Sequence, residues 1–254
     1  MLLRHALGWD RARIVASARE VVSAEAVPRF DALVAERAKR RPLQHLTGTQ
    51  AFWRHEFVVT PDTLIPRPET ELIVEEALRR LGGRPRPVVA DVGTGTGCIA
   101  LSLAAELVDV EVHATEISAA ALAVARENAQ RLGLEGRVTF HEGDLLAPVA
   151  EPPGRFDLIA CNPPYVDPAH ELAPEVRDHE PALALFPPGD PLSVYRRLAP
   201  QALRALKAGG WLILEVGQGR SEAVSALLRS AGLTVEAVVP DLRSIPRTVV
   251  ARRR

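Results

Sequence analysis

The chain has 254 residues, of which 31 are basic, 32 are acidic and 47% are hydrophobic, and its net charge is −1. This balance excludes the strongly basic proteins that bind nucleic acid or acidic membranes through their charge. No stretch approaches the ~20 apolar residues of a membrane helix, and the amino terminus does not resemble a signal peptide. Two cysteines without metal-ligand spacing indicate a reducing compartment. We expect a cytoplasmic monomer with no metal, nucleic-acid or membrane partner.

Residues 1–50 have the apolar spacing of helices and are expected to form a small helical domain with an ordinary core. One apolar face comprises Ile14, Val15, Ala18, Val21 and Val22. A second, following Pro28, comprises Phe30, Leu33, Val34 and Ala38. Residues 51–66 begin with aromatic and β-branched types and end near two prolines, which predicts a hairpin or an extended linker.

Residues 67–254 are predicted to form an α/β domain. After a first helix that ends at Gly82-Gly83, apolar strand patterns alternate with helical ones. Strands are expected at 88–92, 111–115, 137–141, 157–161, 211–216, 234–239 and 247–252. The clearest helix is 118–132, with Ser118 as its cap. Pro200 should kink or break the helix of 193–207. We therefore expect a seven-stranded, mostly parallel sheet with helices on both faces.

The tetrapeptide Asn162-Pro163-Pro164-Tyr165 follows the apolar run 156–161, so it should lie at the carboxyl end of a strand, where open α/β sheets bind ligands. The two prolines have no N–H and a fixed φ, which leaves a stiff turn that offers acceptors only. The Asn162 side-chain oxygen and the Pro163 carbonyl suit a planar NH₂ group, and Tyr165 could cover its flat face or simply pack. The substrate is expected to present an amide or an exocyclic amine. The proline-rich stretch 163–192 that follows is long enough to be a functional loop.

A glycine-rich segment, Asp91-Val92-Gly93-Thr94-Gly95-Thr96-Gly97, directly follows the apolar residues Val88-Val89-Ala90. The dinucleotide fingerprint has glycines at its first, third and sixth places, and here Cys98 stands at the sixth place. The loop therefore departs from that fingerprint, and it contains no phosphate-binding lysine. The loop better suits a nucleoside with an amino-acid tail, S-adenosylmethionine. Glu116, nineteen residues later, could accept from both ribose hydroxyls or could be a solvated charge. Asp144 and Leu145 could contact the adenine, or Asp144 could be a turn residue.

Together, DVGTGTG, Glu116, GDLL and NPPY resemble class I S-adenosylmethionine-dependent methyltransferases that methylate amino groups. The match is closer still to the peptide chain release factor glutamine methyltransferases, the PrmC or HemK family. It includes LIPRPETE at 64–71, RRPLQHLTGTQAFW at 40–53, VRDHEPALAL at 176–185 and the final DLRSIPRTVVARR. The resemblance covers nearly the whole chain. NPPY alone is shared with adenine-N6 DNA methyltransferases, and the combination with LIPRPETE is more specific.

The resemblance implies a Rossmann-like methyltransferase domain that moves a methyl group from S-adenosylmethionine to the N5 amide nitrogen of the glutamine in the Gly-Gly-Gln motif of release factors. The product would be S-adenosylhomocysteine. The implied cofactor contacts are Gly93, Thr94, Gly95, Thr96, Gly97, Glu116, Asp144, Leu145 and Asn162. The implied substrate contacts are Asn162, Pro163, Pro164 and Tyr165, of which Asn162, Pro163 and Tyr165 would be catalytic.

Two departures from the family stand out. Leu145 replaces a usual aromatic residue, and the helical, substrate-docking domain is shorter than usual. Arg67 and Glu69 would line the cleft between the domains. Cys98 and Cys161 lack a base partner and are interpreted as small apolar fillers.

The chemistry itself leaves alternatives open. An adenine-N6 methyltransferase would also place an amine between the same two acceptors, but it should carry a basic face that this chain lacks. A glutamine methyltransferase of a ribosomal protein would use the same site, and a non-catalytic binding protein would use the same fold. An amide nitrogen can lose its proton after it attacks the methyl group, so no strong base is expected, and His179 is a weak candidate for one.

Overall fold

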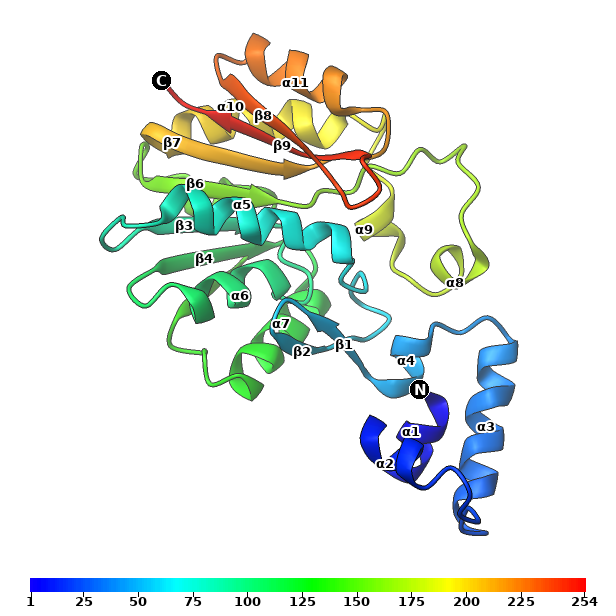
Figure 1. The fold of residues 1–254 in the computed structure, drawn as a ribbon. Helices are drawn as coiled ribbons and strands as arrows, with labels where there is room; N and C mark the ends of the chain where they lie inside the picture. Colours follow the sequence, from blue (N-terminus) through cyan, green and yellow to red (C-terminus); the bar gives the residue numbers. More distant parts are fainter.

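The computed structural model describes all residues 1–254 and contains a seven-stranded sheet in the order β5-β4-β3-β6-β7-β9-β8 (Figure 1). Its strands are β3 (Val88–Val92), β4 (Glu111–Glu116), β5 (Val138–Glu142), β6 (Phe156–Cys161), β7 (Leu206–Glu215), β8 (Thr234–Pro240) and β9 (Pro246–Arg252). The first five pair in parallel, and β9 is antiparallel to both β7 and β8. The predicted fold class, a mostly parallel seven-stranded sheet, is confirmed.

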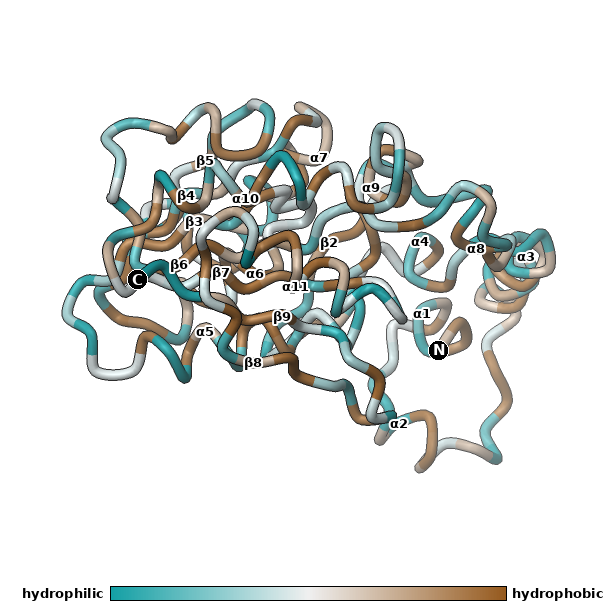
Figure 2. The backbone as a smooth tube through the Cα atoms, turned by 90° about the horizontal axis from the view of Figure 1, so that it is seen from above, coloured by the Kyte–Doolittle hydropathy of each residue, from teal (hydrophilic) through white to brown (hydrophobic).

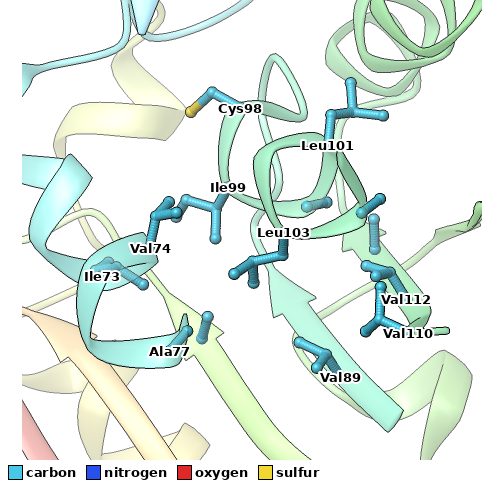
Figure 3. Close-up of a cluster of buried hydrophobic side chains, with 14 of the residues drawn as sticks. Ile73, Val74, Ala77, Val89, Cys98, Ile99, Leu101, Leu103, Val110 and Val112 are labelled. Atoms are coloured by element: carbon cyan, nitrogen blue, oxygen red, sulfur yellow. The ribbon is translucent and has the colours of Figure 1, made fainter. Parts of the chain in front are cut away.

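Alternating side chains along the strands divide the core into two layers. On β3, Val89 belongs to one hydrophobic cluster, and Ala90 and Val92 belong to the other. The first layer is covered by α5 (Glu71–Leu81) and α6 (Cys98–Glu106), whose apolar side chains meet above the sheet (Figure 3). The second layer is covered by α10 (Ser193–Ala205) and α11 (Ser221–Ser230). Figure 2 shows the hydrophobic colouring of the strands between these layers.

The helix α7 (Ala119–Arg131) begins where the sequence predicts it, because Ser118 Oγ accepts from the Ala121 N–H at 3.2 Å. A kink or a break was predicted at Pro200, and the break is wrong, because α10 continues through Pro200. Pro200 and Arg196, whose carbonyl loses its helical partner, both face solvent, so water can satisfy that carbonyl. The buried face of α10 supplies the packing that keeps the helix whole.

The amino-terminal helices form a separate group beside the sheet domain (Figure 1). They are α1 (Leu2–Leu7), α2 (Arg11–Ala16), α3 (Ala26–Ala38) and α4 (Leu43–Thr47). The predicted helix with a face from Ile14 to Val22 is wrong, because α2 ends at Ala16 and Val21 is 95% exposed. An ordinary core is also absent: only Ala6, Ala26 and Pro42 are buried among these helices. Helices as short as α1 and α2 present too few apolar side chains to enclose one.

An antiparallel hairpin of β1 (Thr49–Phe52) and β2 (His55–Val58) joins these helices to the sheet domain, at the place where a hairpin or linker was predicted. The stretch 163–192 is an extended loop with two short helices, α8 (Pro174–Arg177) and α9 (Ala182–Leu185). Short 3₁₀ turns, Pro68–Thr70 and Ala147–Val149, complete the elements. No helix of the structure combines the length and apolarity that crossing a bilayer requires.

Candidate active site

The glycine-rich loop connects β3 to α6 at the carboxyl edge of the sheet. The N–H groups of Gly93 and Thr94 both donate to the Thr115 carbonyl, at 2.9 and 3.0 Å, so the loop lies against the end of β4. Gly93 and Gly95 have φ of +72° and +56°, and a Cβ on either would point into open space. A left-handed turn with bare backbone therefore faces the cavity at these two positions.

Gly97 has a different place. Its φ is +81°, and a Cβ here would approach Leu101 Cδ1 to 3.0 Å and Ala125 Cβ to 3.4 Å. It caps the amino end of α6 and does not line the cavity. The sequence prediction that Gly97 contacts a cofactor therefore has no support from its position, and helix packing explains the glycine.

Asp91 lies beneath the loop and is fully buried. Its Oδ2 accepts from Thr94 Oγ1 at 2.6 Å and from the Ala100 N–H at 3.1 Å, while Oδ1 has no partner. Burial raises the pKa of Asp91 to about 6, although the two hydrogen bonds act in the opposite direction. The carboxyl therefore ties Thr94 of the loop to Ala100 in the first turn of α6.

Glu116 ends β4 and is only 8% exposed. Its Oε2 accepts from the Gly95 N–H and its Oε1 from the Ser118 N–H, each at 3.0 Å. A carboxylate has about four acceptor positions, so each oxygen of Glu116, which lines the cavity, keeps a free lone pair. The next residue, Ile117, lines the same cavity and is 52% exposed. Sequence reasoning missed Ile117. The signal that could have found it is an apolar residue directly after Glu116, the acidic residue that ends the strand.

Asp144 and Leu145 also line this cavity and follow β5, the strand that pairs with β4. Asp144 Oδ2 pairs with Arg197 of α10, and its Oδ1 accepts from no protein group. Leu145 has a φ of +49°, an uncommon conformation for a leucine. It follows Gly143, where a Cβ would collide with Pro148. The turn after β5 therefore places Leu145 at the cavity, at some cost in backbone strain.

Asn162 follows β6, and its carboxamide is held from behind. Its Nδ2 donates to Thr70 Oγ1 at 3.1 Å, and Thr70 Oγ1 donates to Glu215 Oε2 at 2.6 Å. The Tyr165 hydroxyl donates to the other oxygen of Glu215 at 3.0 Å. No protein group donates to Asn162 Oδ1, which remains available. Thr70 and Glu215 were missed in the sequence, although Thr70 lies within LIPRPETE and Glu215 ends the apolar run of β7.

Two cavities meet at the Asn162-Pro163 turn. The first, of about 330 Å³, contains the glycine loop, Glu116 and Asp144, and the second, of about 400 Å³, contains Tyr165 and Gly217. Of the site residues predicted from the sequence, the first cavity is lined by Gly93, Thr94, Gly95, Thr96, Glu116, Asp144, Leu145, Asn162, Pro163 and Pro164. Tyr165 lines only the second cavity, where its ring packs on Gly217. Both cavities share Leu64, Arg67, Asn162, Pro163 and Ala184.

Two further features shape the walls. Glu180, in the loop after NPPY, accepts from the Ile65 N–H at 3.1 Å and pairs with Arg67, so the loop is attached to the interdomain linker. Cys98 and Cys161 line the first cavity with their thiols largely covered. Burial raises the pKa of Cys98 to about 12 and that of Cys161 well above its usual value.

Comparison with known proteins identifies this arrangement. Residues 1–48 match the PrmC N-terminal domain, and residues 70–177 match the methyltransferase small domain. A release factor glutamine methyltransferase from Cereibacter sphaeroides is 46% identical over 99% of this chain and 88% of its own length. Another from Geobacter sulfurreducens is 44% identical over 99% of this chain and 87% of its own. The chain belongs to the release factor glutamine methyltransferase family.

Solved structures support the fold of this release factor glutamine methyltransferase family member. A methyltransferase from Pyrococcus furiosus matches with a TM-score of 0.60 and 18% identity, covering 86% of this chain and 98% of that one. A ribosomal protein L11 methylase from Lactobacillus delbrueckii matches with a TM-score of 0.55 and 23% identity, covering 75% and 81%. At these identities the likeness concerns the fold alone. The sheet domain thus has the fold of these methyltransferases.

Proposed function

We propose that this protein transfers a methyl group from S-adenosylmethionine to the N5 side-chain amide nitrogen of the glutamine in the Gly-Gly-Gln motif of peptide chain release factors. The observation that carries the proposal is the meeting of two cavities at Asn162, whose Oδ1 is free while its Nδ2 is tied to Thr70. One cavity would hold the cofactor, and the other would admit the glutamine. The named relatives, at up to 46% identity over nearly the whole chain, support this substrate class.

The residues of the first cavity fit S-adenosylmethionine. Open space at Gly93 and Gly95 leaves backbone accessible to the amino-acid tail, and the spare lone pairs of Glu116 suit two ribose hydroxyls. Ile117 and Leu145 offer apolar surface for the flat adenine, and Asp144 Oδ1 could accept from its amine. When bound, S-adenosylmethionine supplies a methyl group made electrophilic by a sulfonium centre.

The Asn162-Pro163 turn would do the chemistry by geometry. Asn162 Oδ1 and the Pro163 carbonyl would accept the two N–H groups of the glutamine amide, which aims its nitrogen at the first cavity. The same acceptors favour the partial positive charge that develops on the nitrogen. One amide proton leaves only after the new C–N bond has formed, so the site needs no strong base. Tyr165 would line the approach of the glutamine, and the helices of residues 1–50 would dock the rest of the release factor.

The proposal is tested by incubating the protein with labelled S-adenosylmethionine and a purified release factor, followed by peptide mass mapping. One added methyl on the Gly-Gly-Gln glutamine is the expected result. A release factor with that glutamine replaced by glutamate serves as the matched control and should gain no label. Parallel reactions contain a ribosomal protein mixture and adenine-containing DNA and RNA. Labelling of either in place of the release factor would contradict the proposal.

A further inference from the structure

The strongest feature outside the predicted site is the buried hydrogen-bond chain behind Asn162. It joins Thr70 at the start of α5, Glu215 at the end of β7 and Tyr165 in the loop after β6. Thr70 is 2% exposed and Glu215 is 1% exposed. A polar chain so deeply buried is costly unless every member is satisfied, which calls for an explanation beyond packing.

The donors in this chain have one consistent direction. Burial raises the pKa of the Tyr165 hydroxyl, which therefore keeps its proton and donates a hydrogen bond to Glu215 Oε1. Glu215 therefore accepts two hydrogen bonds, because Thr70 Oγ1 donates to its other oxygen at 2.6 Å. Burial raises the pKa of Glu215, while the hydrogen bonds from Thr70 and Tyr165 and the charge of Arg247 favour its carboxylate form. In that ionised form the carboxylate only accepts. The single proton of Thr70 is thus used on Glu215, and Thr70 Oγ1 has only lone pairs left for Asn162.

The consequence falls on the orientation of the Asn162 carboxamide. A carboxamide has a donor side and an acceptor side that differ little in shape. Because Thr70 presents an acceptor, the NH₂ of Asn162 must face it, at the observed 3.1 Å, and the carbonyl oxygen must face the cavities. The reversed orientation would present NH₂ to the substrate's NH₂, two donors that cannot bond.

We infer that Thr70 and Glu215 are positioning residues, which orient the Asn162 carboxamide so that its oxygen faces the amide nitrogen to be methylated. This role rests on the proposed function only for its catalytic consequence. The orientation itself is a property of the protein alone and can be measured without any substrate.

The chain has only two asparagines, Asn128 and Asn162, so asparagine-selective ¹⁵N labelling yields two carboxamide signals. Asn128 is an internal reference, because its Nδ2 donates to the Thr96 carbonyl at 2.9 Å and to the Val58 carbonyl at 3.1 Å. In Thr70→Val, we expect water exchange of the Asn162 carboxamide protons to accelerate about tenfold, the worth of one hydrogen bond. The Asn128 protons should not change.

In methylation assays, Thr70→Val should lower kcat about tenfold at saturating cofactor, with the Kd for S-adenosylhomocysteine unchanged. Thr70→Ser keeps the hydroxyl and should restore most of the loss. In an Asn162→Ala background, Thr70→Val should cost nothing further, because its effect passes through Asn162. Glu215→Gln should also lower kcat, since its NH₂ can donate to Thr70 and free that hydroxyl to reverse Asn162.

Thr248→Val is the matched control. Thr248 is fully buried on β9 opposite Glu215, and its hydroxyl has no hydrogen-bond partner. Unchanged Asn162 exchange in Thr70→Val would overturn the inference, and so would accelerated exchange with an unchanged kcat or an equal loss in Thr248→Val. A wild-type protein that methylates no release factor would contradict the proposed function instead, and the exchange measurement would still decide the orientation.

Discussion

Replacing Glu116 with glutamine should weaken cofactor binding through a defined mechanism. In the structure the two carboxylate oxygens each accept one backbone N–H, from Gly95 and from Ser118. A glutamine has one oxygen and one NH₂, so either orientation sets its NH₂ against one of these donors. The variant also offers the ribose one acceptor in place of two.

One hydrogen bond to a charged group is worth about 1.5–3 kcal/mol. We therefore expect the Kd for S-adenosylmethionine, measured by isothermal titration calorimetry, to rise about 10- to 100-fold. The cofactor's ribose would lie away from Asn162, so kcat at saturating cofactor should stay within about twofold. Glu142→Gln is the control, because Glu142 pairs with Glu116 across β4 and β5 but is exposed and does not line the cavity.

Comparison of the two cofactor forms separates hydrogen bonding from charge. S-adenosylhomocysteine lacks the sulfonium charge, so a loss of ribose hydrogen bonds should weaken both forms by the same factor. A loss confined to S-adenosylmethionine would instead indicate general electrostatic attraction by Glu116. A Kd within twofold of the wild-type value for both forms would refute the assignment of Glu116 to the ribose.

Three further outcomes are expected. Asn162→Ala should lower the methylation rate on the order of 10²–10³-fold at saturating cofactor, as for the deletion of one preorganised polar contact, and wild-type turnover would remove Asn162 from the mechanism. Because the folded-state pKa of Asp91 is raised to about 6 from 3.8, its neutral form is favoured by folding. Wild-type stability relative to Asp91→Asn should thus fall as pH rises through this window, by on the order of 3 kcal/mol. Urea denaturation at several pH values would measure this change. A stability difference between the two proteins that does not vary with pH would contradict the raised pKa of Asp91. Gly97→Ala should lose about 1–2 kcal/mol of stability from its positive φ, while the Kd for S-adenosylhomocysteine stays constant in the folded fraction.

The sheet domain was readable from the sequence because each buried strand is a short apolar run bounded by turns. Val88–Val92 and Phe156–Cys161, for example, are predicted within one residue of their observed limits. The same logic failed before residue 25, where apolar spacing suggested a helix face through Val22 but no surface covers it. Periodicity reports burial only where a neighbouring layer exists.

The front of the site was also predictable, since Asn162 and the glycine loop directly follow strands. Its back was not. Thr70 and Glu215 are 145 residues apart, and Tyr165 is 50 residues from Glu215. No local pattern links them, and a threonine at the start of a helix or a glutamate at the end of a strand usually has an ordinary structural role. The strand order, which sets β6 beside β7, brings Tyr165 to Glu215, and the packing of α5 on the sheet brings Thr70 to the same carboxylate.

The two covered thiols that line the first cavity have a consequence for the proposed chemistry. A thiolate is a far stronger nucleophile than a carboxamide nitrogen, so an ionised cysteine near a sulfonium methyl would be alkylated by it. Burial keeps Cys98 and Cys161 protonated at neutral pH. Under the proposed function, the protein could therefore hold a reactive alkylating agent against sulfur-containing walls without modifying itself, and the weaker nucleophile of the substrate would meet no internal competitor.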